Sequence, residues 1–294
     1  MAGLKQMVQM RGGIRTLTVP LRTKLHLYVS VTSITGAIAD IPSADLTGAT
    51  LIPTKPNFKL EPLMPVSIYN VLQLKESPFF NKAFLAAGRY LDPNLVDILK
   101  EMKRLSSVIS VILTPGSPRV HTGLFLDAVY SINHRLSSLS GFESESKEDA
   151  LQESCRLGAL LYTRESLQGI PTLGILPLNV VMKLKTNLML IDKSFSEPVL
   201  LWLLVLGGIR SQTDPLKTWF IDGLVKLAPV LGVSTWMDAQ RVLKDFIWVG
   251  EVLDKQSQLL WDEVEAARTS QEAQVIAPRR FPLSSYDSCL RYIY

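Results

Sequence analysis

The sequence contains few residues that could hold a metal ion or form a disulfide. Its 294 residues include two cysteines, Cys155 and Cys289, and three histidines. Two cysteines cannot build a disulfide framework, and a binuclear zinc cluster needs six. No Cys-x-x-Cys or His-x-x-x-His spacing is present either. The cysteine content therefore fits a reducing compartment, and we expect neither a metal site nor another cofactor.

Long hydrophobic runs are also missing. The longest, at residues 198–209, would span roughly 18 Å as a helix, whereas the hydrocarbon core of a bilayer is about 30 Å thick. This length predicts a buried helix, and we expect no membrane partner. The first residues show no basic segment followed by an apolar one, so we expect no signal peptide.

Motifs for phosphate binding and catalysis are equally absent. Gly12-Gly13 and Gly207-Gly208 lack the spacing of a phosphate-binding loop, and no GxSxG or HExxH segment occurs. Asp238, Asp245 and Glu251 have the spacing of a charged helical face. The sequence predicts no catalytic residue. A helical enzyme with an apolar pocket is a disfavoured alternative, because the Asp-Asp-x-x-Asp metal motif of such enzymes is missing.

Three reactive or charged side chains on helical segments have structural interpretations. Arg156 is expected at a helix edge, with its stem packed and its head in water; a buried ion pair or a carboxylate clamp is the alternative. Cys155 is expected to be an inert buried thiol, because a redox role needs exposure and a lowered pKa. His134 is expected to be a surface or internally satisfied histidine, since no orienting partner for a base is visible.

The net charge of +4 is unevenly distributed along the chain. The first 60 residues hold seven basic and two acidic residues, so they carry +5 and the remainder carries −1. A solvated basic edge explains this pattern. The alternative is a surface that faces a DNA-binding module.

Apolar residues at helical spacing dominate the chain from residue 92 onward. Asp92-Pro93 predicts the start of a helix of about 20 residues that ends before Pro115-Gly116. Seven further helices are expected. Three lie at about 122–138, from a capping pair at Ser146 and Asp149 to about 169, and at 178–192. The other four run from 197 to a weakened end at Gly207-Gly208, from 214, from a cap at Ser234 to about 248, and around Trp261 to a polar end near Arg268. All five tryptophans lie in the last four helices, where aromatic rings usually form core.

Four stretches interrupt this helical pattern. Residues 53–78 are proline-rich and predict a loop, and residues 140–149 are rich in Ser and Glu and predict a linker. Residues 27–38 are rich in β-branched side chains, which favours a strand. The carboxy-terminal tail, 270–294, has no pattern that we can assign.

Several segments, in this order, carry a resemblance to a known family. The first is the helix-like segment that ends in Arg11-Gly12-Gly13, and a later one is the apolar segment with Trp202 and Gly207-Gly208. Between and after them lie residues 130–136, the segment 155–162 with Arg156, and the positions Trp219, Trp248 and Trp261. Together they resemble the C-terminal regulatory region of fungal zinc-cluster transcription factors, over roughly residues 3–266. Residues 29–33 depart from it, because they lack the large aromatic that the family has there.

The resemblance implies a fold and a role. It implies an all-α fold, a large antiparallel array of about ten helices in one domain over residues 1–269, with a helix where residues 27–38 otherwise favour a strand. It also implies a nuclear regulatory domain that acts through protein partners or a homodimer, with a small-molecule effector as a further option, and no enzyme activity. Because the zinc cluster is missing, we expect no sequence-specific DNA binding by this chain alone. The alternative role is a dominant-negative partner that dimerises with a full-length factor.

Overall fold

The computed structural model describes residue 68 and residues 90–113, 122–139, 146–167, 178–191, 197–211 and 214–276. In these ranges the chain forms eight α-helices and one π-helical turn, with no strand. The all-α prediction is therefore confirmed. Residues 1–67 lie outside the described part, and with them Arg11-Gly12-Gly13, the basic first 60 residues and the strand-like residues 27–38.

The first four α-helices begin and end close to their predicted positions. They are α6 (Pro93–Leu113), α7 (Thr122–Ser138), α8 (Lys147–Tyr162) and α9 (Leu178–Leu190), and the π-helical turn η2 (Thr163–Leu167) follows α8 directly. Asp92 caps α6 because its Oδ1 accepts from the Asn94 amide at 2.8 Å. Ser146 caps α8 as predicted, since its Oγ accepts from the Asp149 amide at 3.0 Å. The predicted linker 140–149 therefore overlaps the first turn of α8.

The last four α-helices carry the tryptophans and show three boundary corrections. They are α10 (Glu197–Arg210), α11 (Asp214–Leu227), α12 (Trp236–Asp245) and α13 (Gly250–Ile276). Thr235, not Ser234, caps α12, because its side chain and that of Asp238 bond each other's backbone amides. The helix α12 ends at Asp245, so Trp248 lies in the connection to α13. The predicted end of the last helix near Arg268 was wrong, since α13 continues to Ile276. The predicted boundary between the helical domain and the tail, at residue 270, therefore falls inside α13.

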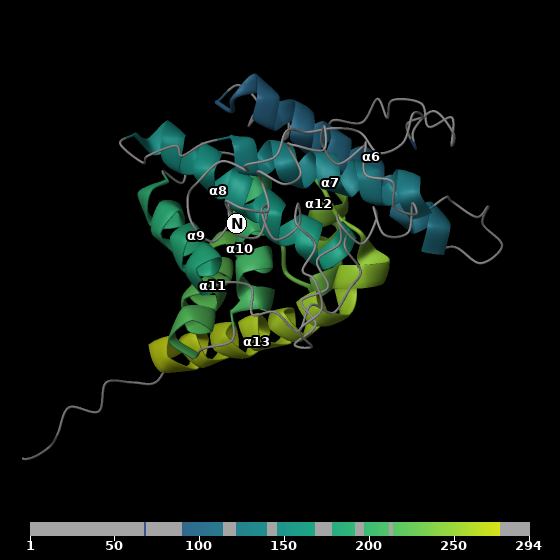
Figure 1. The fold of residues 1–294 in the computed structure, drawn as a ribbon. Coiled ribbons are helices and arrows are strands. Elements are labelled where there is room, and N and C mark those ends of the chain that lie inside the picture. Colours follow the sequence, from purple (N-terminus) through teal and green to yellow (C-terminus); the bar gives the residue numbers. More distant parts are fainter. Residues whose placement is uncertain are drawn as a thin grey trace, which may run out of the picture.

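Helix α10 lies at the centre of the described part (Figure 1). It contacts α8, α9, α11, α12 and α13, while α6 and α7 pack against α8 and η2. The long helix α13 runs along the edge opposite α6 (Figure 1). The predicted buried helix at residues 198–209 is thus confirmed, and its apolar residues on all sides explain why it occupies the centre.

The core is continuous across these helices. Its largest fully buried side chains include Trp202, Trp261, Tyr162 and Phe220. Ile68, the one described residue of the predicted loop 53–78, is helical and buried in the same core, so a surface loop does not extend over that position. No described helix combines the length and the hydropathy that crossing a bilayer would require.

Candidate functional site

Gly207 and Gly208 lie inside α10 and do not end it, which corrects the prediction of a weakened helix end. A Cβ atom on Gly207 would lie 2.1 Å from Cε1 of Phe220, and one on Gly208 would lie 2.6 Å from Cδ2 of Leu260. Both separations are shorter than a van der Waals contact. The two glycines therefore let α11 and α13 approach the backbone of α10 more closely than any other residue would allow.

Gly158 plays the same part on the other side of α10. A Cβ atom there would lie 2.3 Å from Cδ2 of Leu203 and 2.8 Å from Cζ3 of Trp202. This role of Gly158 was not predicted from the sequence. Its position inside an apolar helical segment was the available signal, because glycine in a helix interior costs stability unless close packing requires it.

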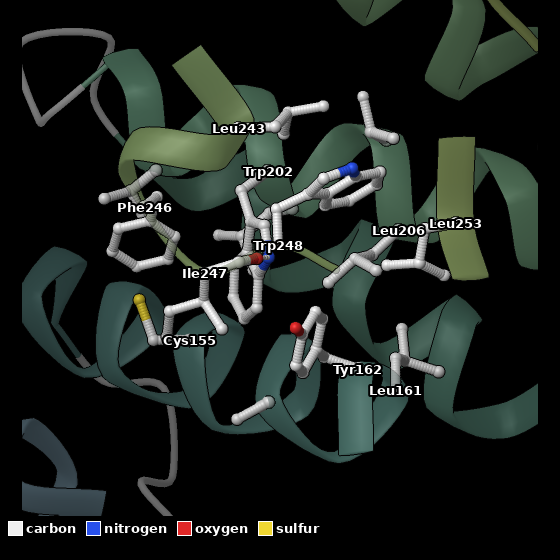
Figure 2. Close-up of a cluster of buried hydrophobic side chains, with 14 of the residues drawn as sticks. Cys155, Leu161, Tyr162, Trp202, Leu206, Leu243, Phe246, Ile247, Trp248 and Leu253 are labelled. Atoms are coloured by element: carbon white, nitrogen blue, oxygen red, sulfur yellow. Dashed lines mark hydrogen bonds between the residues drawn. The ribbon is translucent and has the colours of Figure 1, made fainter. Parts of the chain in front are cut away.

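Trp202 packs against Gly158. One hydrogen bond and two aromatic neighbours hold its ring (Figure 2). The indole lies edge-on to Phe246 with 5.0 Å between ring centroids, and Tyr162 lies 6.0 Å away. Its Nε1 donates to the carbonyl of Ile247 at 2.9 Å, so the buried indole nitrogen is satisfied. The central helix is thereby tied to the connection between α12 and α13.

Trp248 fixes the same connection from the other end. Its Nε1 donates to Oδ1 of Asp254 at 2.8 Å, and the other oxygen of Asp254 accepts from Nε2 of Gln240 at 2.5 Å. Asp254 thus joins α12, the connection and α13. This role of Asp254 was not predicted, because no sequence motif indicates that a carboxylate pairs with a tryptophan six residues away.

Trp219 and Trp261 also pack against neighbouring side chains. Trp219 is half-buried, stands edge-on to Phe220 at 5.0 Å, and has Nζ of Lys185 5.5 Å from its ring centroid. Trp261 is 1% exposed and lies 6.5 Å from Trp236. The prediction that the tryptophans form core is confirmed for residues 202, 248 and 261, while Trp219 and Trp236 pack at its edge.

Arg156 does not hold its head in water, so the edge interpretation was wrong and the alternative ion pair is present. Its guanidinium pairs twice with Glu153, with distances of 2.7 Å (Nε–Oε2) and 2.9 Å (Nη2–Oε1), and Nη1 donates to the Leu136 carbonyl at 3.2 Å. The side chains of Arg156 and Glu153 are 11% and 1% exposed. Nζ of Lys183 lies 3.3 Å from the same carboxylate. This network joins α7, α8 and α9.

Cys155, Tyr162 and His134 are buried or hydrogen-bonded. Burial raises the pKa of Cys155 to about 12, which confirms the prediction of an inert thiol. Burial also raises the pKa of Tyr162, whose hydroxyl lies 2.7 Å from Oγ of Ser106. His134 is partly buried on α7, with Nδ1 3.4 Å from Oγ of Ser138, as expected for a satisfied histidine.

The described residues provide packing contacts and ion pairs. Across those ranges, no group of three or more His, Cys, Asp or Glu side chains could hold a metal ion. Two of the three carboxylates that were predicted to form a charged face have structural roles. Asp238 completes the cap of α12, and Glu251 accepts from Oγ of Ser110 on α6 at 3.1 Å.

Comparison with protein-family models, with curated proteins and with solved structures gave no match.

Proposed function

We propose that this chain is a regulatory domain of a fungal transcription-factor-like nuclear protein, acting through contacts with a partner protein, a second copy or a small ligand. The observation that carries the proposal is the position of the residues behind the family resemblance. Six of those inside the described ranges belong to the packed core around α10: Trp202, Gly207, Gly208, Trp219, Trp248 and Trp261. The seventh, Arg156, pairs with Glu153 on α8, which contacts α10. Because these residues serve packing, they support a domain that acts through the conformation it presents to a partner and not through catalysis.

A central helix of this kind suits regulation by contact. Packed interiors are close to solid density, so a shift at one helix has to be accommodated by its neighbours. Because α10 contacts α8, α9, α11, α12 and α13, a partner that binds any of these biases the packing of the others. The proposal includes no sequence-specific DNA binding by this chain, since two cysteines cannot form the family's zinc cluster.

A tethering experiment tests the proposal. The full chain is fused to an unrelated DNA-binding domain and expressed in fungal cells with a reporter gene that carries the matching site. We expect the fusion to change reporter output relative to the DNA-binding domain alone. We expect Gly207→Leu to abolish the change by separating α10 from α11, and Arg241→Gln, on the surface, to retain it. Equal output from the fusion and the DNA-binding domain alone, at matched protein levels, would contradict the proposal.

A titration with DNA tests the second part. Fluorescence anisotropy of labelled duplexes is measured across a range of salt concentrations. We expect at most weak binding that disappears as salt is raised, because only phosphate contacts would contribute. Sequence-selective binding that survives high salt would overturn the claim that DNA contact lies outside this chain.

A further inference from the structure

The π-helical turn η2 brings two arginines and one glutamate together beside the carboxyl end of α10. Thr163 anchors the turn, because its Oγ1 donates to Oδ1 of Asn133 at 2.9 Å from α7. Glu165 lies in the same turn, and its Oε1 is 2.5 Å from Nη2 of Arg210, the last residue of α10. Arg164, also in the turn, is half-buried. Single π-helical turns are rare and recur at functional sites.

Arg164 has an unmet hydrogen-bonding requirement. Its Nε is fully buried and has no hydrogen-bond partner among the atoms of the protein. Burial lowers the pKa of Arg164, and the nearby positive charge of Arg210 lowers it further, whereas Glu165 opposes this effect. Both guanidinium groups therefore lie near the carboxylate of Glu165, which pairs with Arg210. The three groups carry a net charge of +1 in a region that is partly shielded from water. A charged donor without an acceptor is costly in such surroundings.

We propose that Arg164 and Arg210 form a binding site for an oxyanion, either a phosphate or a carboxylate group of a small ligand. Such a group accepts two parallel hydrogen bonds from a guanidinium and would offset the net positive charge of the two arginines. The carboxylate of Glu165 already pairs with the guanidinium of Arg210 and therefore competes with the ligand for it. Anion binding is independent of the proposed function. An effector role for the ligand rests on the proposed function.

Thermal unfolding of the full chain tests binding. Sodium phosphate and, in a separate arm, sodium acetate are titrated at constant ionic strength maintained with sodium chloride, so that general screening is the same throughout. We expect phosphate to raise the unfolding midpoint in a saturable way, with a dissociation constant on the order of 1 mM. The acetate arm shows whether a single carboxylate is sufficient. A midpoint that does not respond to either anion would overturn the proposal.

Two variants and a matched control assign the effect. Arg164→Gln should lose the anion-dependent shift yet unfold at the same or a higher temperature without anion, because an unpartnered charge is removed. Arg241→Gln removes an arginine whose side chain is 73% exposed and should keep the shift. Glu165→Gln should tighten phosphate binding by at least about threefold, because a competing charge is lost. A saturable shift that persists in Arg164→Gln, or weaker binding in Glu165→Gln, would contradict the assignment.

The tethered reporter separates this inference from the proposed function. If the anion is an effector, Arg164→Gln should change the reporter output of the tethered chain while leaving its abundance unchanged. Unchanged output together with lost phosphate binding would keep the site and overturn its effector role. An inactive wild-type fusion would overturn the proposed function and leave the binding result standing.

Discussion

At Arg156, one carboxylate and one backbone carbonyl replace water around a charged group. The pair with Glu153 is almost fully enclosed, and Lys183 adds a second positive charge from α9. Both partners lie on α8 three residues apart, a spacing at which helical side chains meet, so the pair itself was readable from the sequence. What the sequence could not indicate is that α7 and α9 would cover it.

Glu153→Gln is expected to lower the free energy of unfolding by about 3 kcal/mol, because it leaves the buried Arg156 guanidinium without its counterion. The matched control is Glu263→Gln, which breaks the more exposed pair with Lys217 and should cost less than about 1 kcal/mol. Urea unfolding followed by circular dichroism measures both. Equal losses in the two variants would show that the enclosed pair contributes no more than the surface one.

Cys155 and Tyr162 make the fold sensitive to alkali. Burial raises the pKa of both groups from usual values of 9.0 and 10.0, so the folded chain keeps protons that the unfolded chain releases. Their contribution to stability is therefore complete below about pH 9 and decreases as the pH rises, by about 1.4 kcal/mol per pH unit for each group. Unfolding free energies measured from pH 8 to pH 11 should decrease less steeply in Cys155→Ala and in Tyr162→Phe. Identical slopes in the variants and the wild type would contradict this.

At the scale of the helices, starts were predictable and glycine roles were not. Asp92-Pro93 and Ser146 predict helix starts correctly because a cap depends on residues two or three positions away. Gly207 and Gly208 were misread as an end because their role depends on Phe220 and Leu260, which lie on other helices. Local sequence favours alanine over glycine there, and only the packed structure reverses that preference.

Gly207→Ala should therefore destabilise the fold by about 2–3 kcal/mol, although alanine has the higher helix propensity. Gly208→Ala should cost less, because its nearest obstacle is the end of the Leu260 side chain, which moves more easily than the enclosed ring of Phe220. Chemical denaturation of the two variants provides the comparison. A stabilising effect of Gly207→Ala would show that α10 and α11 are not in close contact at this point.

The cap of α12 allows a direct choice between the two assignments. Thr235→Ala should cost about 1 kcal/mol, because it removes the acceptor for the Asp238 amide, whereas Ser234→Ala should leave stability nearly unchanged. The shift in urea midpoint distinguishes them. The reverse order would return the cap to Ser234, the residue that the sequence pattern favoured.

At the scale of the whole molecule, hydrophobic periodicity was sufficient to predict the helices from residue 92 onward and one buried helix. The residues of α10 are apolar on every side, which is the pattern of a helix with neighbours all around it. Periodicity does not specify which helices those neighbours are, so the contacts of α10 with α12 and α13 were not predictable. The Arg164–Glu165–Arg210 group was not predicted for the same reason. Arg210 lies 45 residues after Glu165 in the sequence, and no local motif connects them.

The central claim is that the described tryptophans and glycines behind the family resemblance form one cooperatively stabilised packing centre around α10. Native-state hydrogen exchange of the full chain, measured residue by residue, tests this most directly. The amides of residues 201–206 should exchange only through global unfolding, with a free energy equal to that from denaturant, while the exposed residues 269–273 of α13 exchange much faster. Exchange of residues 201–206 through local opening, at a free energy well below the global value, would contradict the claim.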